Sequence, residues 1–120
     1  MGKIESHRDL IVWQKSIDIA VQVYRLTEKF PSHEKFGLTS QLTRAAASVA
    51  ANIAEGNARG SSKDYAHFLS IARGSLMETE TFLTLATRLN YLQSVELQPT
   101  LALIQEIDRM LNVLRAKLLS

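Results

Sequence analysis

Apolar residues recur at steps of three and four along almost the whole chain, and this spacing constrains the fold more than any other feature. Residues spaced in this way lie on one side of an α-helix, so each such stretch predicts an amphipathic helix. Glycine occurs five times and proline twice in 120 residues, which favours a few long elements over many short ones. The pattern predicts an all-α protein with four helices, at about 9–30, 38–57, 62–91 and 98–118.

Turn and capping residues predict where these helices end. Asp9 is a candidate N-cap of the first helix, which stops at Phe30 because the following proline disfavours helical backbone in the residue before it. Gly56 or Asn57 ends the second helix, and Pro99 lies in the first turn of the fourth. Connections shorter than about ten residues place consecutive helices side by side, so we expect an antiparallel up-down-up-down bundle.

The whole chain is expected to form a single domain, residues 1–120, with 1–8 as a flexible N-terminal segment. Cysteine is absent, which excludes disulfides and a thiol nucleophile and fits a reducing compartment. No stretch approaches the roughly 20 apolar residues that span a membrane, and the N-terminus lacks a secretory signal pattern. We therefore expect a soluble cytoplasmic protein without a membrane partner. With 14 basic and 12 acidic residues, nucleic-acid binding depends on how the cations cluster.

The first predicted helix has two apolar sides. One side consists of Leu10, Trp13, Ile17, Ala20, Val21 and Tyr24. The other consists of Val12, Ile19, Val23, Leu26 and Phe30. An outer helix of a monomeric bundle needs only one apolar side, so the second indicates either a subunit interface or cover by a loop or the chain termini. The apolar positions alone do not separate these alternatives, and the set from Val12 to Phe30 is the candidate oligomer interface.

The second helix carries a polar row beside its alanines. Its members are Gln41, Arg44, Ser48, Asn52 and Glu55. Buried polar groups need hydrogen-bond partners, so the row has either a structural or a binding role. In the structural interpretation, Asn52 and Glu55 cap or bridge neighbouring helices, and Arg44 pairs with Glu78 or Glu80. In the functional interpretation, the row belongs to a surface that contacts a ligand or nucleic acid.

No residue pattern indicates an enzyme. His7, His33 and His67 lie in three different elements, and the glutamates of the second and third helices are not followed by histidine three residues on. Glu78 and Glu80 are two residues apart on a helix, so their carboxylates diverge by about 200° and do not share a proton. No serine belongs to an identifiable motif with a base. We expect no catalytic residue, metal, cofactor or small-molecule substrate.

The run from Arg44 to Ser48, followed by Asn52-Ile53-Ala54-Glu55-Gly56 and Arg59, resembles the signature of small bacterial four-helix proteins encoded in intervening sequences of 23S rRNA genes. The resemblance extends over about residues 9–118. The agreeing segments are Asp9-Leu10 with Trp13, Phe30-Pro31, Glu34 with Phe36-Gly37-Leu38, Phe68-Leu69, Ala72 with Gly74-Ser75-Leu76, Glu78 with Glu80, and Tyr91-Leu92. One departure is Phe82, where that family has a polar residue, usually glutamine.

That family is similar to the accessory variability protein of diversity-generating retroelements, a homopentameric helical barrel that binds nucleic acid and a reverse transcriptase. The resemblance therefore implies a homopentamer and makes RNA, DNA or a nucleoprotein a candidate partner. Four cations on or near the connection between the second and third helices and the start of the third are the candidate nucleic-acid contacts: Arg44, Arg59, Lys63 and Arg73. Binding by so few charges would be weak and lost with salt.

Two functional hypotheses follow. In the first, the chain is a non-enzymatic, homo-oligomeric bundle that binds RNA, DNA or a nucleoprotein through these cations. In the second, it is a structural or protein-interaction module with no nucleic-acid role, whose second apolar side serves self-assembly or one protein partner. The near-neutral charge favours the second hypothesis.

Overall fold

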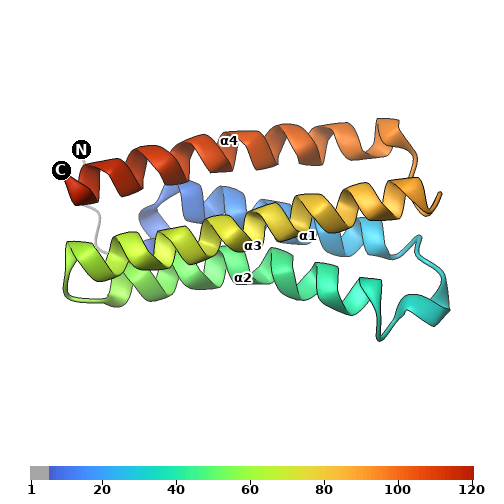
Figure 1. The fold of residues 1–120 in the computed structure, drawn as a ribbon, viewed down its shortest axis with the longest axis horizontal. Helices are drawn as coiled ribbons and strands as arrows, with labels where there is room; N and C mark the ends of the chain where they lie inside the picture. The colour runs from blue at the N-terminus through green and yellow to red at the C-terminus, as the bar shows by residue number, and fades with distance from the viewer. Residues whose placement is uncertain (1–5) are drawn as a thin grey trace.

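The computed structural model describes residues 6–120, and within them the chain forms four α-helices and two 3-10 helices. The α-helices are α1 (Ile11–Thr27), α2 (Leu38–Ala58), α3 (Ser62–Arg88) and α4 (Ser94–Leu119). The 3-10 helices are η1 (His7–Asp9) and η2 (Ser32–Glu34). Each α-helix runs opposite to the one before it (Figure 1). The prediction of an all-α four-helix bundle is confirmed.

α1 and α3 lie diagonally across the bundle. Each of them packs against α2 and α4, and among residues 6–120 no close backbone contact joins α1 to α3. The centre is filled by fully buried side chains from all four helices: Ile19, Leu42, Ile53, Leu69, Leu76, Leu83, Ile104, Ile107 and Leu111. The outer faces of α1 and α3 therefore belong to opposite sides of the molecule.

The prediction that one side of α1 is a subunit interface is wrong, because that side faces the core of its own bundle. Its five residues are buried or half-buried: Val12, Ile19, Val23, Leu26 and Phe30. Together with Ser16 they repeat at steps of four and three, which is the heptad spacing of a bundle core. Ser16 interrupts this apolar row in the sequence, but its hydroxyl donates to the Val12 carbonyl (2.7 Å) and so needs no partner outside the helix.

α1 is shorter than predicted at both ends. Asp9 does not cap it, because the Asp9 carboxylate accepts the Ser6 N–H (3.3 Å) within η1, and Leu10 is extended. The helix ends at Thr27, three residues before Phe30. Of the N-terminal segment 1–8, predicted to be flexible, residues 1–5 lie outside the described part of the chain, whereas His7 and Arg8 belong to η1.

The connection between α3 and α4 also differs from the prediction. α3 ends at Arg88, because Asn90 adopts the left-handed conformation (φ 65°) that commonly terminates helices. α4 begins at Ser94 rather than near 98, because Gln93 and Glu96 form a capping box in which the Gln93 N–H donates to Glu96 Oε1 (2.9 Å). Pro99 consequently lies in the second turn of α4 rather than in the first.

Gly56 does not end α2, which continues to Ala58. It is buried and allows α2 and α3 to approach closely. A Cβ at position 56 would lie 2.8 Å from the Phe68 Cβ, 3.0 Å from Tyr65 Cδ1 and 3.2 Å from the Tyr65 carbonyl oxygen. The absence of a side chain at this position therefore sets the spacing of the two helices next to their connection.

Glu34 links the two helix connections at the end of the bundle away from the termini. Its Oε1 accepts the Leu38 N–H (3.1 Å) at the start of α2, and its Oε2 accepts the Tyr91 hydroxyl (2.9 Å). The hydrogen bond from Leu38, and to a smaller extent that from Tyr91, lowers the pKa of Glu34. The Glu34 carboxylate in turn raises the pKa of Tyr91. The Tyr91 ring also lies 5.5 Å from the Phe30 ring. The ends of α1 and α3 are thus held at the same end of the bundle.

Candidate functional site

The outer face of α1 carries a row of exposed apolar residues. Ile17, Val21 and Tyr24 are 38, 43 and 54% exposed, and their spacing places them on one side of the helix. They belong to the apolar side that the sequence pattern suggested for the domain's own core. We refer to these three residues as the α1 face. Single exposed apolar residues are ordinary, but a contiguous group marks a contact surface.

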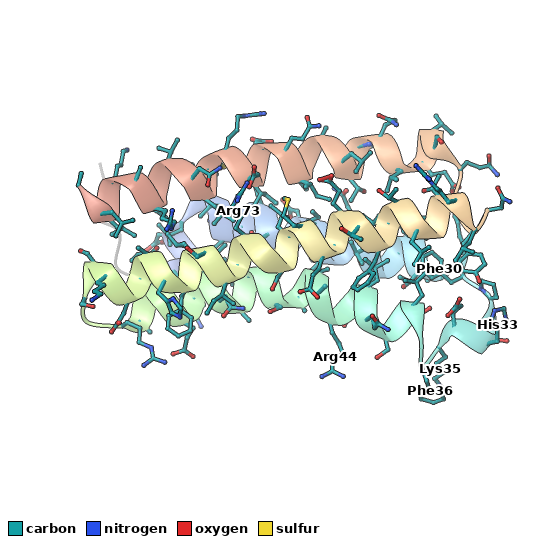
Figure 2. All side chains as sticks on the ribbon, in the orientation of Figure 1. Phe30, His33, Lys35, Phe36, Arg44 and Arg73 are labelled. Atoms are coloured by element: carbon teal, nitrogen blue, oxygen red, sulfur yellow. The ribbon has the colours of Figure 1, made fainter. Side chains whose placement is uncertain are left out.

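The four candidate nucleic-acid cations do not form one patch. Arg44 projects away from the bundle, whereas Arg73 points toward α4 (Figure 2). Arg73 pairs with Asp108 of α4 (2.6 Å). Along α2, positions 44 and 59 are separated by about 22 Å at 1.5 Å per residue. The four cations, which the sequence places near the connection between α2 and α3, are therefore spread over different sides of the molecule.

Arg59 is also engaged within its own bundle. Its Nε lies 3.2 Å from Glu55 Oε2, and its guanidinium lies 4.8 Å from the centre of the Phe68 ring. Arg44 and Lys63 are exposed and make no ion pair with any residue in the described range 6–120. Half of the four predicted cations are thus available to an external anion without breaking an ion pair.

The polar row on α2 is hydrogen-bonded inside the bundle at its half-buried positions. The Asn52 amide donates to the Ser48 carbonyl (2.8 Å) and the Ser48 hydroxyl (2.9 Å). The Ser75 hydroxyl of α3 donates to Ser48 Oγ (3.1 Å), so Ser48 links the two helices. Asn52 therefore bonds within its own helix rather than bridging helices, and Glu55 pairs with Arg59 four residues on rather than capping a helix. These contacts favour the structural interpretation of the row.

The predicted pairing of Arg44 with Glu78 or Glu80 is wrong within the described residues. Gln41, Arg44 and Glu78 do line one shallow polar depression of about 350 Å³ between α2 and α3. Arg44 is exposed and points outward (Figure 2), so water solvates its guanidinium at little cost and no carboxylate is required. Glu80 is half-buried and does not line this depression. Phe82, the departure from the family pattern, lines it too.

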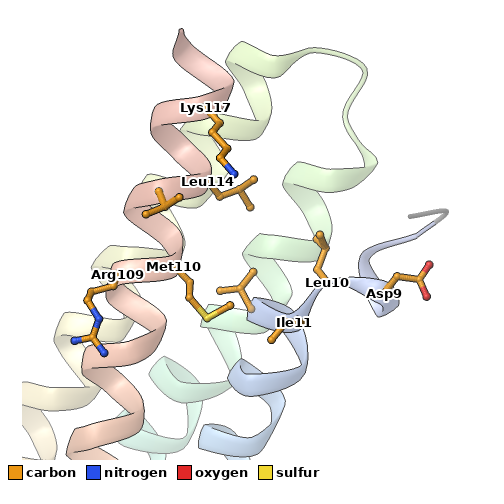
Figure 3. A pocket seen from close by; sticks show the side chains of 9 residues that line it. Asp9, Leu10, Ile11, Arg109, Met110, Leu114 and Lys117 are labelled. Atoms are coloured by element: carbon orange, nitrogen blue, oxygen red, sulfur yellow. The ribbon is translucent and has the colours of Figure 1, made fainter. Parts of the chain in front are cut away.

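An apolar groove lies between the start of α1 and the second half of α4, and sequence reasoning missed it. Its volume is about 420 Å³. Figure 3 shows Met110 and Leu114 of α4 on one side and Leu10 and Ile11 on the other. The groove depends on the separation of α1 from α4, which no sequence period encodes. The available signal was Ile11, an exposed apolar residue outside the core period.

The titratable groups with shifted pKa values lie at helix connections and packed positions. Besides the Glu34 and Tyr91 pair, burial raises the pKa of Tyr65, whose hydroxyl accepts a long hydrogen bond from the Asn57 amide (3.5 Å). None of these three groups lines the depression between α2 and α3 or the groove between α1 and α4. Among residues 6–120, no group of three histidine, aspartate or glutamate side chains is placed to hold a metal ion. Each helix in that range is too short or too polar to cross a bilayer.

The chain is similar to known proteins in both sequence and fold. The sequence model of a family described as 23S rRNA-intervening sequence protein matches residues 8–113. A crystal structure at 1.70 Å of a protein with unknown function from the S23 ribosomal protein family, from Bacteroides thetaiotaomicron VPI-5482, has the same fold with a TM-score of 0.81. The two chains are 28% identical, and the match covers 88% of this chain and 96% of that one. No functionally curated protein matches the sequence.

Proposed function

The chain belongs to the 23S rRNA-intervening sequence protein family, and from this starting point we propose that it is a non-enzymatic, cytoplasmic module that assembles into a homo-oligomer through the α1 face. Five copies are the expected number, because the family resembles the homopentameric accessory variability protein. The assembled form, rather than a catalytic site in one chain, is the working unit.

The exposure of the α1 face is the observation that carries this proposal. Ile17, Val21 and Tyr24 occupy successive turns of one helix, and none of them is needed to fill the bundle core. Transfer of such side chains from water into a contact is favourable by about 25 cal/mol per Å² of apolar surface. A second copy of the chain supplies such a contact, because it also carries exposed apolar residues and is present at the same concentration as the first.

Contact with nucleic acid is a second candidate function, favoured by the charge at the end of the bundle that contains the α2–α3 connection and the end of α4. Exposed cations there make no ion pair with a residue in the range 6–120: Arg8, Lys63, Arg115 and Lys117. In one copy these charges bind phosphates weakly, but an oligomer repeats them and multiplies the effective affinity. The alternative is a protein-interaction module that assembles in the same way without binding nucleic acid.

Light scattering coupled to a size column tests the assembly. The purified chain is expected at about five times its 13.4 kDa mass. Val21→Lys adds a charge to the α1 face and should give monomers that keep the far-ultraviolet circular dichroism of a helical protein. Ala47→Lys adds the same charge to an exposed position on α2 and should leave the mass unchanged. A monomeric wild-type chain at all concentrations refutes the proposal.

Gel retardation of labelled RNA and DNA separates the two candidates. Binding through the cationic end predicts retardation at low salt that disappears as the salt concentration rises. Lys117→Glu should weaken it, whereas Arg44→Glu, on a different part of the surface, should not. Unchanged mobility of both nucleic acids at low salt removes the nucleic-acid role and leaves the protein-interaction module.

A further inference from the structure

The outer face of α3 carries a second group of exposed apolar residues. Ile71, Leu85 and Leu89 are 39, 46 and 44% exposed; Leu85 and Leu89 are one turn apart on the same side, whereas Ile71 lies about 21 Å before Leu85 along the helix. We refer to these three residues as the α3 face. Because α1 and α3 are diagonal in the bundle, the α1 face and the α3 face are on opposite sides of one copy. One molecule therefore has two unlike apolar faces.

The two faces come level with one another at the end of the bundle that contains the Phe30 and Tyr91 contact. α1 and α3 run in the same direction (Figure 1). α1 ends three residues before Phe30 and α3 ends three residues before Tyr91, and the rings of Phe30 and Tyr91 are in contact. Tyr24 and Leu85 are each three residues before the last residue of their helix. They therefore lie at about the same height on opposite sides of the molecule.

One pair of charges beside the two faces is complementary. Glu28 follows Tyr24 by four residues and Arg88 follows Leu85 by three, so both lie about one turn beyond the apolar residue. Counted from the helix ends, Glu28 and Arg88 differ in height by about one residue rise of 1.5 Å. Both are exposed, and neither makes an ion pair with another residue in the range 6–120.

We propose that the α1 face of one copy docks on the α3 face of the next copy, with Tyr24 against Leu85 and Glu28 paired with Arg88. This inference rests on the proposed function, because it names the second surface of the proposed assembly. The partner is a second copy because its register and its charge order match those of the α1 face. Residues at equal height meet when the copies are related by rotation about an axis along the bundle.

A contact between unlike faces determines the kind of assembly. A contact of α1 with α1 is self-complementary and stops at two copies, whereas a contact of α1 with α3 leaves one free face at each end and adds further copies, as a closed ring where the rotation between copies closes and as an open filament where it does not. A ring with an odd number of copies, such as a pentamer, requires unlike faces. The α1–α3 contact satisfies this requirement with surfaces that are already exposed in one copy.

A mixing experiment tests the pairing of the faces. Val21→Glu disables the α1 face and Leu85→Glu disables the α3 face, so each variant alone is expected to be monomeric by light scattering. An equimolar mixture of the two retains one intact face of each kind and should form a dimer of about twice 13.4 kDa and nothing larger. If the wild type is oligomeric and the mixture stays monomeric, the α1–α3 pairing is wrong while self-assembly stands. If the wild type is monomeric, the proposed function itself has failed.

Charge reversal tests the register independently of the apolar contacts. Glu28→Arg and Arg88→Glu should each shift the concentration of half-assembly upward by at least threefold, because each places like charges opposite one another. The double variant restores an opposite pair and should return to within a factor of two of the wild type. Circular dichroism on each variant checks that the bundle is folded. Single variants that assemble like the wild type, or a double variant weaker than both, would overturn the assigned register.

Discussion

The two helical glycines Gly56 and Gly74 offer a matched pair of alanine substitutions with opposite expected signs. In a helix interior, alanine is more favourable than glycine by about 1 kcal/mol, and this gain applies to both. At Gly74 nothing lies within 4 Å of the added Cβ, so the gain is realised in full. At Gly56 the added Cβ meets the Phe68 Cβ at 2.8 Å and the Tyr65 carbonyl at 3.2 Å. Neither atom is the free end of a flexible side chain.

Forcing an atom into such a space costs about 1–3 kcal/mol, and the rigid contacts place Gly56→Ala in the upper part of that range. The overpacking therefore exceeds the gain in helix propensity, and the net loss is about 1–2 kcal/mol. At roughly 4 °C per kcal/mol, Gly56→Ala should lower the Tm by roughly 4–8 °C, and Gly74→Ala should raise it by roughly 4 °C. Thermal unfolding by circular dichroism at one fixed protein concentration measures both. A Gly56→Ala variant more stable than the wild type would refute the close approach of α2 and α3.

Three further predictions concern single side chains. Val23→Lys should lose cooperative helical unfolding in circular dichroism, because an unpaired ammonium in the core costs several kcal/mol in a domain stable by about 5–15 kcal/mol; a folded variant would contradict the burial of Val23. Ser75→Ala removes the hydroxyl bond to Ser48 and should cost about 1 kcal/mol in urea unfolding, and a loss below measurement error would show that the bond does not stabilise the bundle. Glu34→Gln should be less stable than the wild type at neutral pH and equal to it at low pH. The lowered pKa of Glu34 gives a contribution that is present above the unfolded-state value near 4.5 and lost as the pH falls through the folded value; a difference in Tm that persists unchanged at pH 2 would contradict it.

The helices themselves follow from sequence period, because burial of one side of each helix leaves a repeat that is visible without a structure. α2 was predicted within one residue, since Leu38, Leu42, Val49 and Ile53 keep the core spacing throughout. The helix ends were predicted less well, because they depend on side-chain bonds between near neighbours. The capping box at Gln93 is an example, since glutamine is not among the common N-cap residues.

The orientation of α1 could not be predicted, because both of its apolar sides have heptad spacing. Ile17 and Tyr24 are seven residues apart on one side, as Ile19 and Leu26 are on the other, so the period alone does not say which side meets the other helices. The packing of four helices decides it, and that is a property of the whole bundle. Arg73 illustrates the same limit, since its partner Asp108 is 35 residues away in the chain.

The most direct test of self-assembly through the α1 face is the thiol reactivity of the Val21→Cys variant. The introduced thiol is the only one in that variant, because the natural sequence contains no cysteine. In one copy, position 21 is 43% exposed and should react freely. We predict that Val21→Cys is protected at high protein concentration and becomes reactive on dilution, while Ala47→Cys on α2 reacts at the same rate throughout. Equal and concentration-independent rates at both positions would contradict assembly through this face.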